Sequence, residues 1–200
     1  AAGICGLLVL NTSISTVSLL YNDFTVKQTA AFAAIARARK EPALSLCGIA
    51  QKQAEAKFVS ERRLTGADAL LIAADLVTRP QLWKLVVDEN NFGAEGGVAI
   101  CEALLLPPRV PGSPGLKHLS MANTGLNAEG ATAMGAVLGR MQCTLTFLNL
   151  GFNRLGPEGA TSIASALAVN SSLLELNLHY NGLEDRGAEA IIVALQGNSR

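Results

Sequence analysis

The two histidines and four cysteines are the side chains of this sequence that most often build catalytic or metal sites. No two cysteines form a CxxC pair, and no Cys/His cluster has the spacing of a zinc site. Free cysteine is among the residue types most often buried, so we expect reduced, buried thiols of the kind found in cytosolic proteins. The residues concerned are His118, His179, Cys5, Cys47, Cys101 and Cys143.

The motifs of the common enzyme classes are missing from the sequence. There is no glycine-rich phosphate loop, no GxSxG turn around a nucleophilic serine, no HExxH zinc motif and no pair of carboxylates suited to acid–base catalysis. The glycines of residues 93–97 belong to a turn and helix start of the repeat described below. We therefore predict no catalytic residues, no metal and no cofactor, and a protein that is not an enzyme.

Composition indicates a globular chain with an aliphatic core. Half of the 200 residues are hydrophobic but only 4% are aromatic, so Leu, Ile, Val and Ala must fill the interior. The 16 basic and 16 acidic residues give a net charge of zero, which argues against a nucleic-acid or anionic-membrane partner. The apolar start of the chain is shorter than the roughly 20 residues that span a membrane and lacks a basic leader. We expect a cytoplasmic protein.

A pattern of the form L-x-x-L-x-L-x-x-N-x-L recurs along the chain. Copies at 145–155 and 173–183 begin 28 residues apart, and a copy at 116–126 begins 29 residues earlier. Copies at 82–92 and 14–24 also fit. Helical segments rich in small residues, with apolar positions at helical spacing, follow at 93–104, 127–138, 156–167 and 184–195. An acidic residue near each helix start suits the helix dipole.

Two parts of the chain depart from the regular pattern. A helical half at 64–76 follows a weak strand in which Phe58 stands one residue too far from Leu64. Prolines at 107, 108, 111 and 114 predict a surface loop. We predict one domain, 1–200, with repeats at 14–36, 54–81, 82–115, 116–144, 145–172 and 173–200, and insertions at 37–53 and 105–115.

Asparagines also mark the helix ends. Asn170 and Asn198 fall just after helical segments, where asparagine can adopt a left-handed terminating conformation. Asn11 stands before Ile14 as Asn170 stands before Leu173. Residues 1–13 are therefore interpreted as the tail of a preceding repeat's helix, and the apolar side chains of residues 1–10 are expected in the core.

The period and the small-residue helices resemble the ribonuclease-inhibitor class of leucine-rich repeats, over nearly the whole chain and most weakly at 37–63. That class includes ribonuclease inhibitor, the sensor domains of NOD-like receptors and the activating protein of the GTPase Ran. The resemblance implies an α/β leucine-rich repeat solenoid, a curved horseshoe with parallel strands on its concave face and helices on its convex face. It also implies that a protein partner is held in the concavity.

The repeat predicts which strand residues point inward. Counting the first leucine as position 1, positions 4 and 6 face the core because alternate strand residues share a face; Leu148 with Leu150 and Leu176 with Leu178 are examples. The asparagine at position 9 is expected to hydrogen-bond backbone groups where the strand ends, a structural role. These asparagines are Asn22, Asn90, Asn153 and Asn181.

Positions 3, 5, 7 and 8 are expected to face outward, Leu20 among them. Phe147, Phe152, His179 and Tyr180 are predicted to form one compact aromatic group, which either anchors a protein partner or packs against neighbouring repeats. The candidate protein-binding residues are Tyr21, Lys84, Asp88, Glu89, His118, Asn123, Phe147, Asn149, Phe152, Glu175, Asn177, His179 and Tyr180.

Other outward-facing residues have simpler interpretations. His118 and His179 lie about two strands apart, too far at roughly 4.8 Å per strand to share a metal ion. Asp88 and Glu89 are interpreted as a solvated edge, and Trp83 as packing at a strand start.

Three functions remain open at this point. The leading hypothesis is a protein-binding scaffold or ligand-sensing module. The alternative, drawn from the resemblance, is an activator of a small GTPase, although no functional residue of that family maps onto a matching motif here. A third is a structural spacer. Ends without polar caps also predict self-association.

Overall fold

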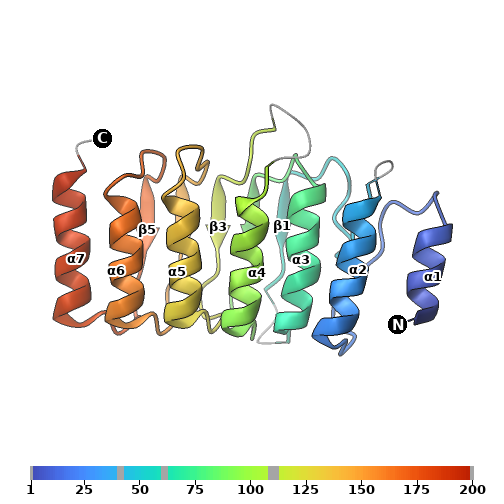
Figure 1. The fold of residues 1–200 in the computed structure, drawn as a ribbon, viewed down its shortest axis with the longest axis horizontal. Helices are drawn as coiled ribbons and strands as arrows, with labels where there is room; N and C mark the ends of the chain where they lie inside the picture. The colour runs from blue at the N-terminus through green and yellow to red at the C-terminus, as the bar shows by residue number, and fades with distance from the viewer. Residues whose placement is uncertain (1, 40–42, 60–62, 108–112, 199–200) are drawn as a thin grey trace.

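The computed structural model describes residues 2–39, 43–59, 63–107 and 113–198. Its helices form a single row in chain order, with the strands in a second layer behind them (Figure 1). The helices are α1 (Ala2–Leu10), α2 (Val26–Ala38), α3 (Gly66–Thr78), α4 (Gly93–Leu105), α5 (Asn127–Leu138), α6 (Gly156–Leu167) and α7 (Glu184–Gly197). The strands are β1 (Glu55–Lys57), β2 (Lys84–Val86), β3 (His118–Ser120), β4 (Phe147–Asn149) and β5 (Glu175–Asn177).

The five strands form one open parallel sheet in the order β1-β2-β3-β4-β5. Equivalent positions of successive repeats lie side by side, so that Ala56, Leu85, Leu119, Leu148 and Leu176 form one line across the sheet. The predicted α/β solenoid, with parallel strands on one side and helices on the other, is confirmed.

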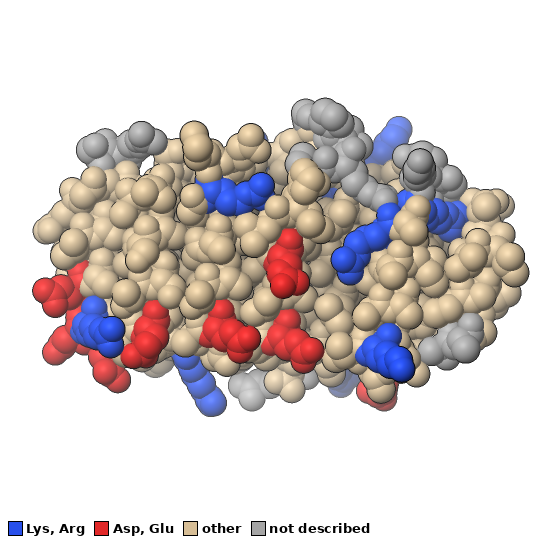
Figure 2. Space-filling view, viewed as in Figure 1, with Lys and Arg blue, Asp and Glu red and all other residues tan. Residues whose placement is uncertain are grey.

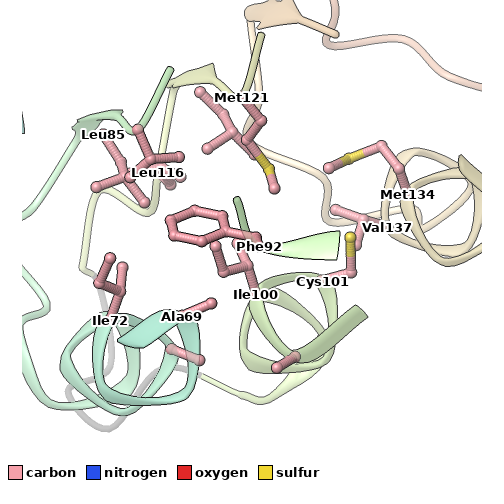
Figure 3. Close-up of a cluster of buried hydrophobic side chains, with 14 of the residues drawn as sticks. Ala69, Ile72, Leu85, Phe92, Ile100, Cys101, Leu116, Met121, Met134 and Val137 are labelled. Atoms are coloured by element: carbon pink, nitrogen blue, oxygen red, sulfur yellow. The ribbon is translucent and has the colours of Figure 1, made fainter. Parts of the chain in front are cut away.

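Inward-facing strand leucines and the helices build a continuous core. Leu85, Leu119 and Leu148 have no exposed surface. Phe92, at position 11 of its repeat, points into the space between strand residues such as Leu85 and helix residues such as Ile100 (Figure 3). Each repeat therefore buries its apolar face only through its neighbours, which is the packing that makes a solenoid stable.

Small residues allow the helices to pack closely. A Cβ atom added at Gly159 of α6 would lie 2.9 Å from the Cβ of Ala131 on α5. A side chain at this position would push the two helices apart, which explains the glycines and alanines of the helical segments.

The segment 43–49, within the predicted insertion 37–53, belongs to the core. Leu44, Leu46 and Ile49 are buried, and Ser45 pairs with Thr16 in a parallel bridge. A second bridge, between residues 18 and 47, is antiparallel, and the first repeat has no continuous strand. This packing also covers Leu20, which is buried and does not face outward as predicted. The insertion begins with the end of α2, and its residues 40–42 lie outside the described residues, as do 108–112 of the second insertion.

The expectation that the apolar side chains of residues 1–10 lie in the core is wrong. Helix α1 forms as predicted, but Leu7, Val9 and Leu10 are exposed, and Leu8 is its buried leucine. The apolar start is not core because one face of a single helix is covered and the rest is not. No helix in the described part of the chain is long and apolar enough to cross a membrane.

The asparagines after the helices act through their side chains rather than through a left-handed backbone. Asn198 ends α7 with a φ of −91°, and Asn170 is likewise absent from the positive-φ residues. The Asn170 amide donates to Leu138 O at 2.7 Å, and that of Asn198 donates to Leu167 O at 2.6 Å. Each side chain thus ties its repeat to the preceding one.

Candidate functional site

The face of the sheet opposite the helices, called the strand face below, carries the candidate residues. All of them are exposed or half-buried there: Tyr21, Lys84, Asp88, Glu89, His118, Asn123, Phe147, Asn149, Phe152, Glu175, Asn177, His179 and Tyr180. Lys84 makes an ion pair with Glu55 on the neighbouring strand at 3.7 Å, and its ammonium lies 5.9 Å from the ring centroid of Trp83. Both contacts are at the surface and contribute little to stability.

Three rings gather where β4 and β5 end. Phe152 and Tyr180 stack with their centroids 4.7 Å apart and their planes 8° apart. The His179 ring meets Phe152 edge-on at 4.5 Å and Tyr180 edge-on at 5.7 Å. Phe152 remains 47% exposed and Tyr180 77% exposed. We call these three residues the aromatic cluster.

Phe147 does not join the aromatic cluster, which corrects the predicted group of four. Its ring stacks on His118, with centroids 4.0 Å apart and planes 2° apart. The reason is register: His118 and Phe147 are paired residues of adjacent parallel strands, whereas Phe152 lies five residues further along the chain. The strand face therefore has two separate aromatic contacts, one at each end of the strands.

The stacked His118 ring has a perturbed protonation equilibrium. Burial of the ring, and secondly the positive charge of Lys84, lower the pKa of His118 from its ordinary value of 6.5, and Asp88, Glu175 and Glu55 oppose this only in part. The folded chain thus binds this proton more weakly than the unfolded chain does. The contribution of neutral His118 to stability is therefore present above the ordinary pKa of 6.5 and declines as the pH falls towards the lowered pKa.

Removing the stacked ring tests this account. In Phe147→Ala the imidazole gains solvent, so the titration midpoint of His118, followed by NMR of its ring protons, is expected to move up towards the ordinary value. His179, which does not touch Phe147, serves as the internal control. An unchanged or lower His118 midpoint would show that burial by Phe147 is not the cause.

Position 8 of the repeat has a left-handed backbone in all five motif copies. The φ angles of the five residues at this position lie between 52° and 63°, with Phe152 at 59° and Tyr180 at 52°. The five residues are Tyr21, Glu89, Asn123, Phe152 and Tyr180. Such conformations are unusual for residues other than glycine and asparagine. The turn therefore holds the Phe152 and Tyr180 rings at the same position of adjacent repeats.

Polar side chains link the strands between the two aromatic contacts. Asp88 accepts hydrogen bonds from Ser120 Oγ at 2.7 Å and from the Ala122 amide at 2.7 Å, so it is not the freely solvated residue that the sequence predicts. Asn149 donates to Ser120 Oγ at 3.0 Å. Sequence reasoning missed Ser120, which is buried; its outward position in the repeat carried no sign of the Asp88 carboxylate beside it.

The position-9 asparagines form a second line of contacts beneath the strand ends. The Asn153 amide donates to Met121 O, Leu150 O and Gly151 O, and its oxygen accepts from the amides of Thr124 and Leu126. Asn90 and Asn181 make equivalent bonds. Asn22 is exposed and donates to its own turn, at Leu19 O and Leu20 O.

Two of the four expected buried thiols, Cys47 and Cys101, are buried, whereas Cys5 and Cys143 are half-buried. All four cysteines are free. Burial, and secondly the Asp75 carboxylate, raise the pKa of Cys47, and burial raises the pKa of Cys101 to about 12. Both thiols are thus held in the protonated form, which is a poor nucleophile. Among the residues that the structure describes, no three His, Cys, Asp or Glu side chains are grouped to hold a metal ion.

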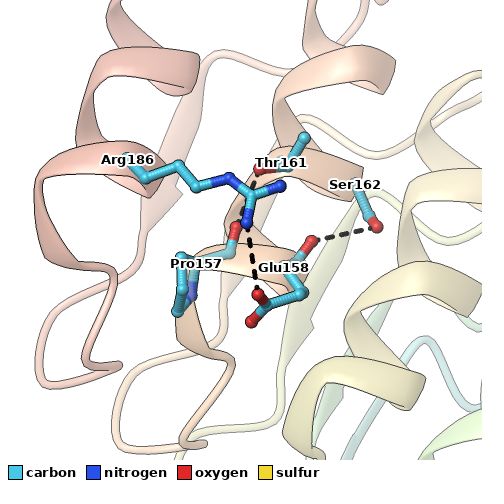
Figure 4. A network of polar contacts seen from close by, with 5 residues as sticks. All are labelled: Pro157, Glu158, Thr161, Ser162 and Arg186. Atoms are coloured by element: carbon cyan, nitrogen blue, oxygen red, sulfur yellow. Dashed lines mark hydrogen bonds and ion pairs between the residues drawn. The ribbon is translucent and has the colours of Figure 1, made fainter.

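The helix face carries charge but no comparable group of contacts. Acidic residues follow the edge where α4–α7 begin (Figure 2), where their negative charges interact favourably with the positive ends of the helix dipoles. Arg186 and Glu158 pair across α7 and α6 at 3.4 Å, with Thr161 and Ser162 bonded to carbonyls of their own helix (Figure 4). Both charged side chains are mostly exposed, so the pair contributes little.

Comparison with known families agrees with this geometry. Residues 142–164 and 169–191 match the family described as Leucine Rich repeat. These two segments are leucine-rich repeats. They cover β4 with most of α6 and β5 with the first part of α7, the part of the chain that carries the aromatic cluster. A search of curated proteins found no match. The fold as a whole is an α/β leucine-rich repeat solenoid, and such repeats generally mediate protein–protein interaction.

Proposed function

We propose that this leucine-rich repeat chain is a binding scaffold that holds a protein partner on its strand face, and that it has no catalytic role of its own. The aromatic cluster carries this proposal. Large rings that stay exposed while held in a fixed backbone conformation are typical interface anchors. The hydrogen-bonded polar residues beside them supply contacts that need little reordering on binding.

Finer features are proposed on the same basis. The 28–29-residue period and the helix in each regular repeat support the ribonuclease-inhibitor type and a ligand-sensing role similar to that of NOD-like receptors. Four free cysteines support a reducing, cytoplasmic location.

The exposed side chains of Leu174, Ile192 and Leu195 support self-association of the isolated chain. A monomer mass that stays constant in light scattering as the protein concentration rises would contradict self-association.

The proposed partner site is tested by removing its rings. Phe152→Ala combined with Tyr180→Ala is expected to weaken partner binding about thirtyfold or more, because truncating an interface anchor costs about 2 kcal/mol or more. Partner capture from the native cell extract, followed by titration of the captured protein, measures this loss.

Met141→Ala is the matched control, since Met141 is fully exposed at 103% and lies in the turn after α5. Equal binding by both variants would place the interface elsewhere on the chain.

The second candidate function, activation of a small GTPase, is favoured by no contact in the described part of the chain. Stimulated GTP hydrolysis by a captured GTPase would support that function instead.

A further inference from the structure

The aromatic cluster holds a histidine whose protonated nitrogen is defined by its surroundings. Asn177 Oδ1 accepts a hydrogen bond from the His179 backbone amide at 3.0 Å and lies 2.6 Å from His179 Nδ1. The backbone amide can only donate, so the Asn177 atom facing it is the oxygen, and an amide oxygen can only accept. Nδ1 must therefore carry the hydrogen, which leaves Nε2 of the neutral ring as a hydrogen-bond acceptor.

The neighbouring repeat leaves room for this ring. Position 7 is Asp88 in the repeat of β2 and Ala122 in the repeat of β3, but it is Gly151 beside His179. A Cβ atom added at Gly151 would lie 2.5 Å from His179 Cε1 and 2.6 Å from Nδ1. Any side chain there would displace the imidazole, so the glycine is part of the arrangement that positions it.

The surroundings of Nε2 combine an acceptor with flat apolar surface. No residue in the described part of the chain hydrogen-bonds to Nε2, and His179 is exposed. The stacked rings of Phe152 and Tyr180 stand at right angles to the imidazole and are themselves exposed. A group that fills this site must cover ring surface and donate one hydrogen bond.

We propose that the aromatic cluster is a subsite for an aromatic side chain with a hydrogen-bond donor, a tyrosine or tryptophan of the partner, whose O–H or N–H is directed at His179 Nε2. Aromatic rings pair favourably edge-on or offset with other rings, and buried Tyr and Trp need a partner for their polar atom. This inference rests on the proposed function, because it names the partner side chain that the strand face selects.

Arginine is the competing occupant, since a guanidinium also stacks on rings and donates hydrogen bonds. The electrostatics of the aromatic cluster argue against arginine. Neither the Lys84–Glu55 ion pair nor the Arg186–Glu158 ion pair involves the aromatic cluster. A cation placed there would be repelled by the His179 ring whenever that ring is protonated.

Three blocked aromatic amino acids, with N-acetyl-argininamide as the competitor, serve as probes of the subsite. N-acetyl-tyrosinamide, N-acetyl-tryptophanamide and N-acetyl-phenylalaninamide are titrated into ¹⁵N-labelled chain while the backbone amide shifts are followed. The tyrosine and tryptophan probes are expected to shift Gly151, Phe152, His179 and Tyr180, and to bind about two- to tenfold tighter than the phenylalanine probe, as one added hydrogen bond predicts. Equal affinities, shifts elsewhere, or tighter binding of N-acetyl-argininamide would overturn the proposal.

A glycine substitution tests the part played by His179 without altering the cluster residues. Gly151→Ala is expected to displace the flexible imidazole and abolish the preference for tyrosine over phenylalanine. Gly197→Ala is the matched control, because an added Cβ there meets nothing within 4 Å. A tyrosine preference that persists in Gly151→Ala would contradict the assigned role of the ring.

The tautomer gives a readout that needs no ligand. ¹⁵N shifts of the His179 ring in its neutral form are expected to show hydrogen on Nδ1 and none on Nε2, and Asn177→Ala is expected to release this preference. Hydrogen on Nε2 in the unaltered chain would overturn the proposal. Failure of the probes to discriminate, with partner binding still lost in Phe152→Ala/Tyr180→Ala, would overturn this inference and leave the proposed function standing.

Discussion

Asp75→Ala is expected to lower the free energy of unfolding by about 3 kcal/mol, the largest effect of any single substitution considered for this chain. The Asp75 carboxylate has no exposed surface and accepts hydrogen bonds from Ser45 Oγ at 2.6 Å, Leu46 N at 2.8 Å and Cys47 N at 3.1 Å. Alanine removes the acceptor of Leu46 N and Ser45 Oγ, and each buried group left unpaired costs about 1–3 kcal/mol; Cys47 N keeps a bond to Ser45 Oγ at 3.3 Å.

The charge of Arg79 adds to this cost. Arg79, the residue that follows α3, is 1% exposed and donates to Ile49 O of the same segment at 2.9 Å and to Ser15 O at 2.9 Å. Loss of the Asp75 carboxylate removes its electrostatic compensation. An opposing effect limits the total: burial raises the pKa of Asp75, which means that the carboxylate itself is costly to bury, and alanine recovers that cost.

Urea unfolding measures the change, with Glu102→Ala, an exposed carboxylate on α4, as the matched control. Solenoids unfold through neighbouring repeats, so native-state hydrogen exchange gives the location. The amides of Leu46 and Cys47 are expected to lose protection in Asp75→Ala while those of β4 and β5 keep theirs. A loss below about 1 kcal/mol with protected amides would show that the 43–49 segment is held by its apolar contacts alone.

The regular repeats were predictable because their signal is local and repeated. Inward leucines such as Leu148, one repeat after another, mark both the strand and its register, and the small-residue helices follow at constant spacing. The weak strand before Leu64 was also located, although Ala56 takes the leucine's place in the sheet there.

The segment 43–49 was not predictable in this way. Leu44 and Leu46 have strand spacing, but no helix follows before β1, so the repeat pattern fails. The bonds that hold the segment come from Asp75 and Arg79, 28–36 residues away in sequence. Such long-range polar contacts leave no periodic trace.

The outward placement of the candidate residues was predictable, but their arrangement was not. Counting positions assigned the outward residues, whereas which rings meet depends on the backbone. Phe152 and Tyr180 carry no local mark of a left-handed conformation; only Asn123 at the equivalent position is a residue that favours it. Outward positions in the repeat group Phe147 with Phe152 and Tyr180, although strand register places Phe147 against His118.

Asn153→Ala is expected to destabilise the fold by about 2–3 kcal/mol, whereas Asn22→Ala, the same repeat position, is expected to cost less than about 1 kcal/mol. Asn153 has no exposed surface, and its side chain satisfies backbone groups of two repeats, including Met121 O at 2.7 Å and Thr124 N at 3.0 Å. In the variant the buried amides of Thr124 and Leu126 lose their acceptor, whereas Met121 O keeps its bond from Thr124 Oγ1 at 2.9 Å. Asn22 is exposed, so water replaces its bonds to Leu19 O and Leu20 O.

Urea midpoints of the two variants, at an unchanged m-value, give the comparison. Asn153→Asp sharpens it, because an oxygen in place of the amide nitrogen faces the carbonyls of Met121 and Leu150 while the acceptor towards Thr124 is kept. We expect this variant to be at least as unstable as Asn153→Ala at neutral pH, since like partial charges then oppose each other in a buried site. Equal losses in Asn153→Ala and Asn22→Ala would mean that repeat position, and not burial of the bonded groups, sets the contribution of these asparagines.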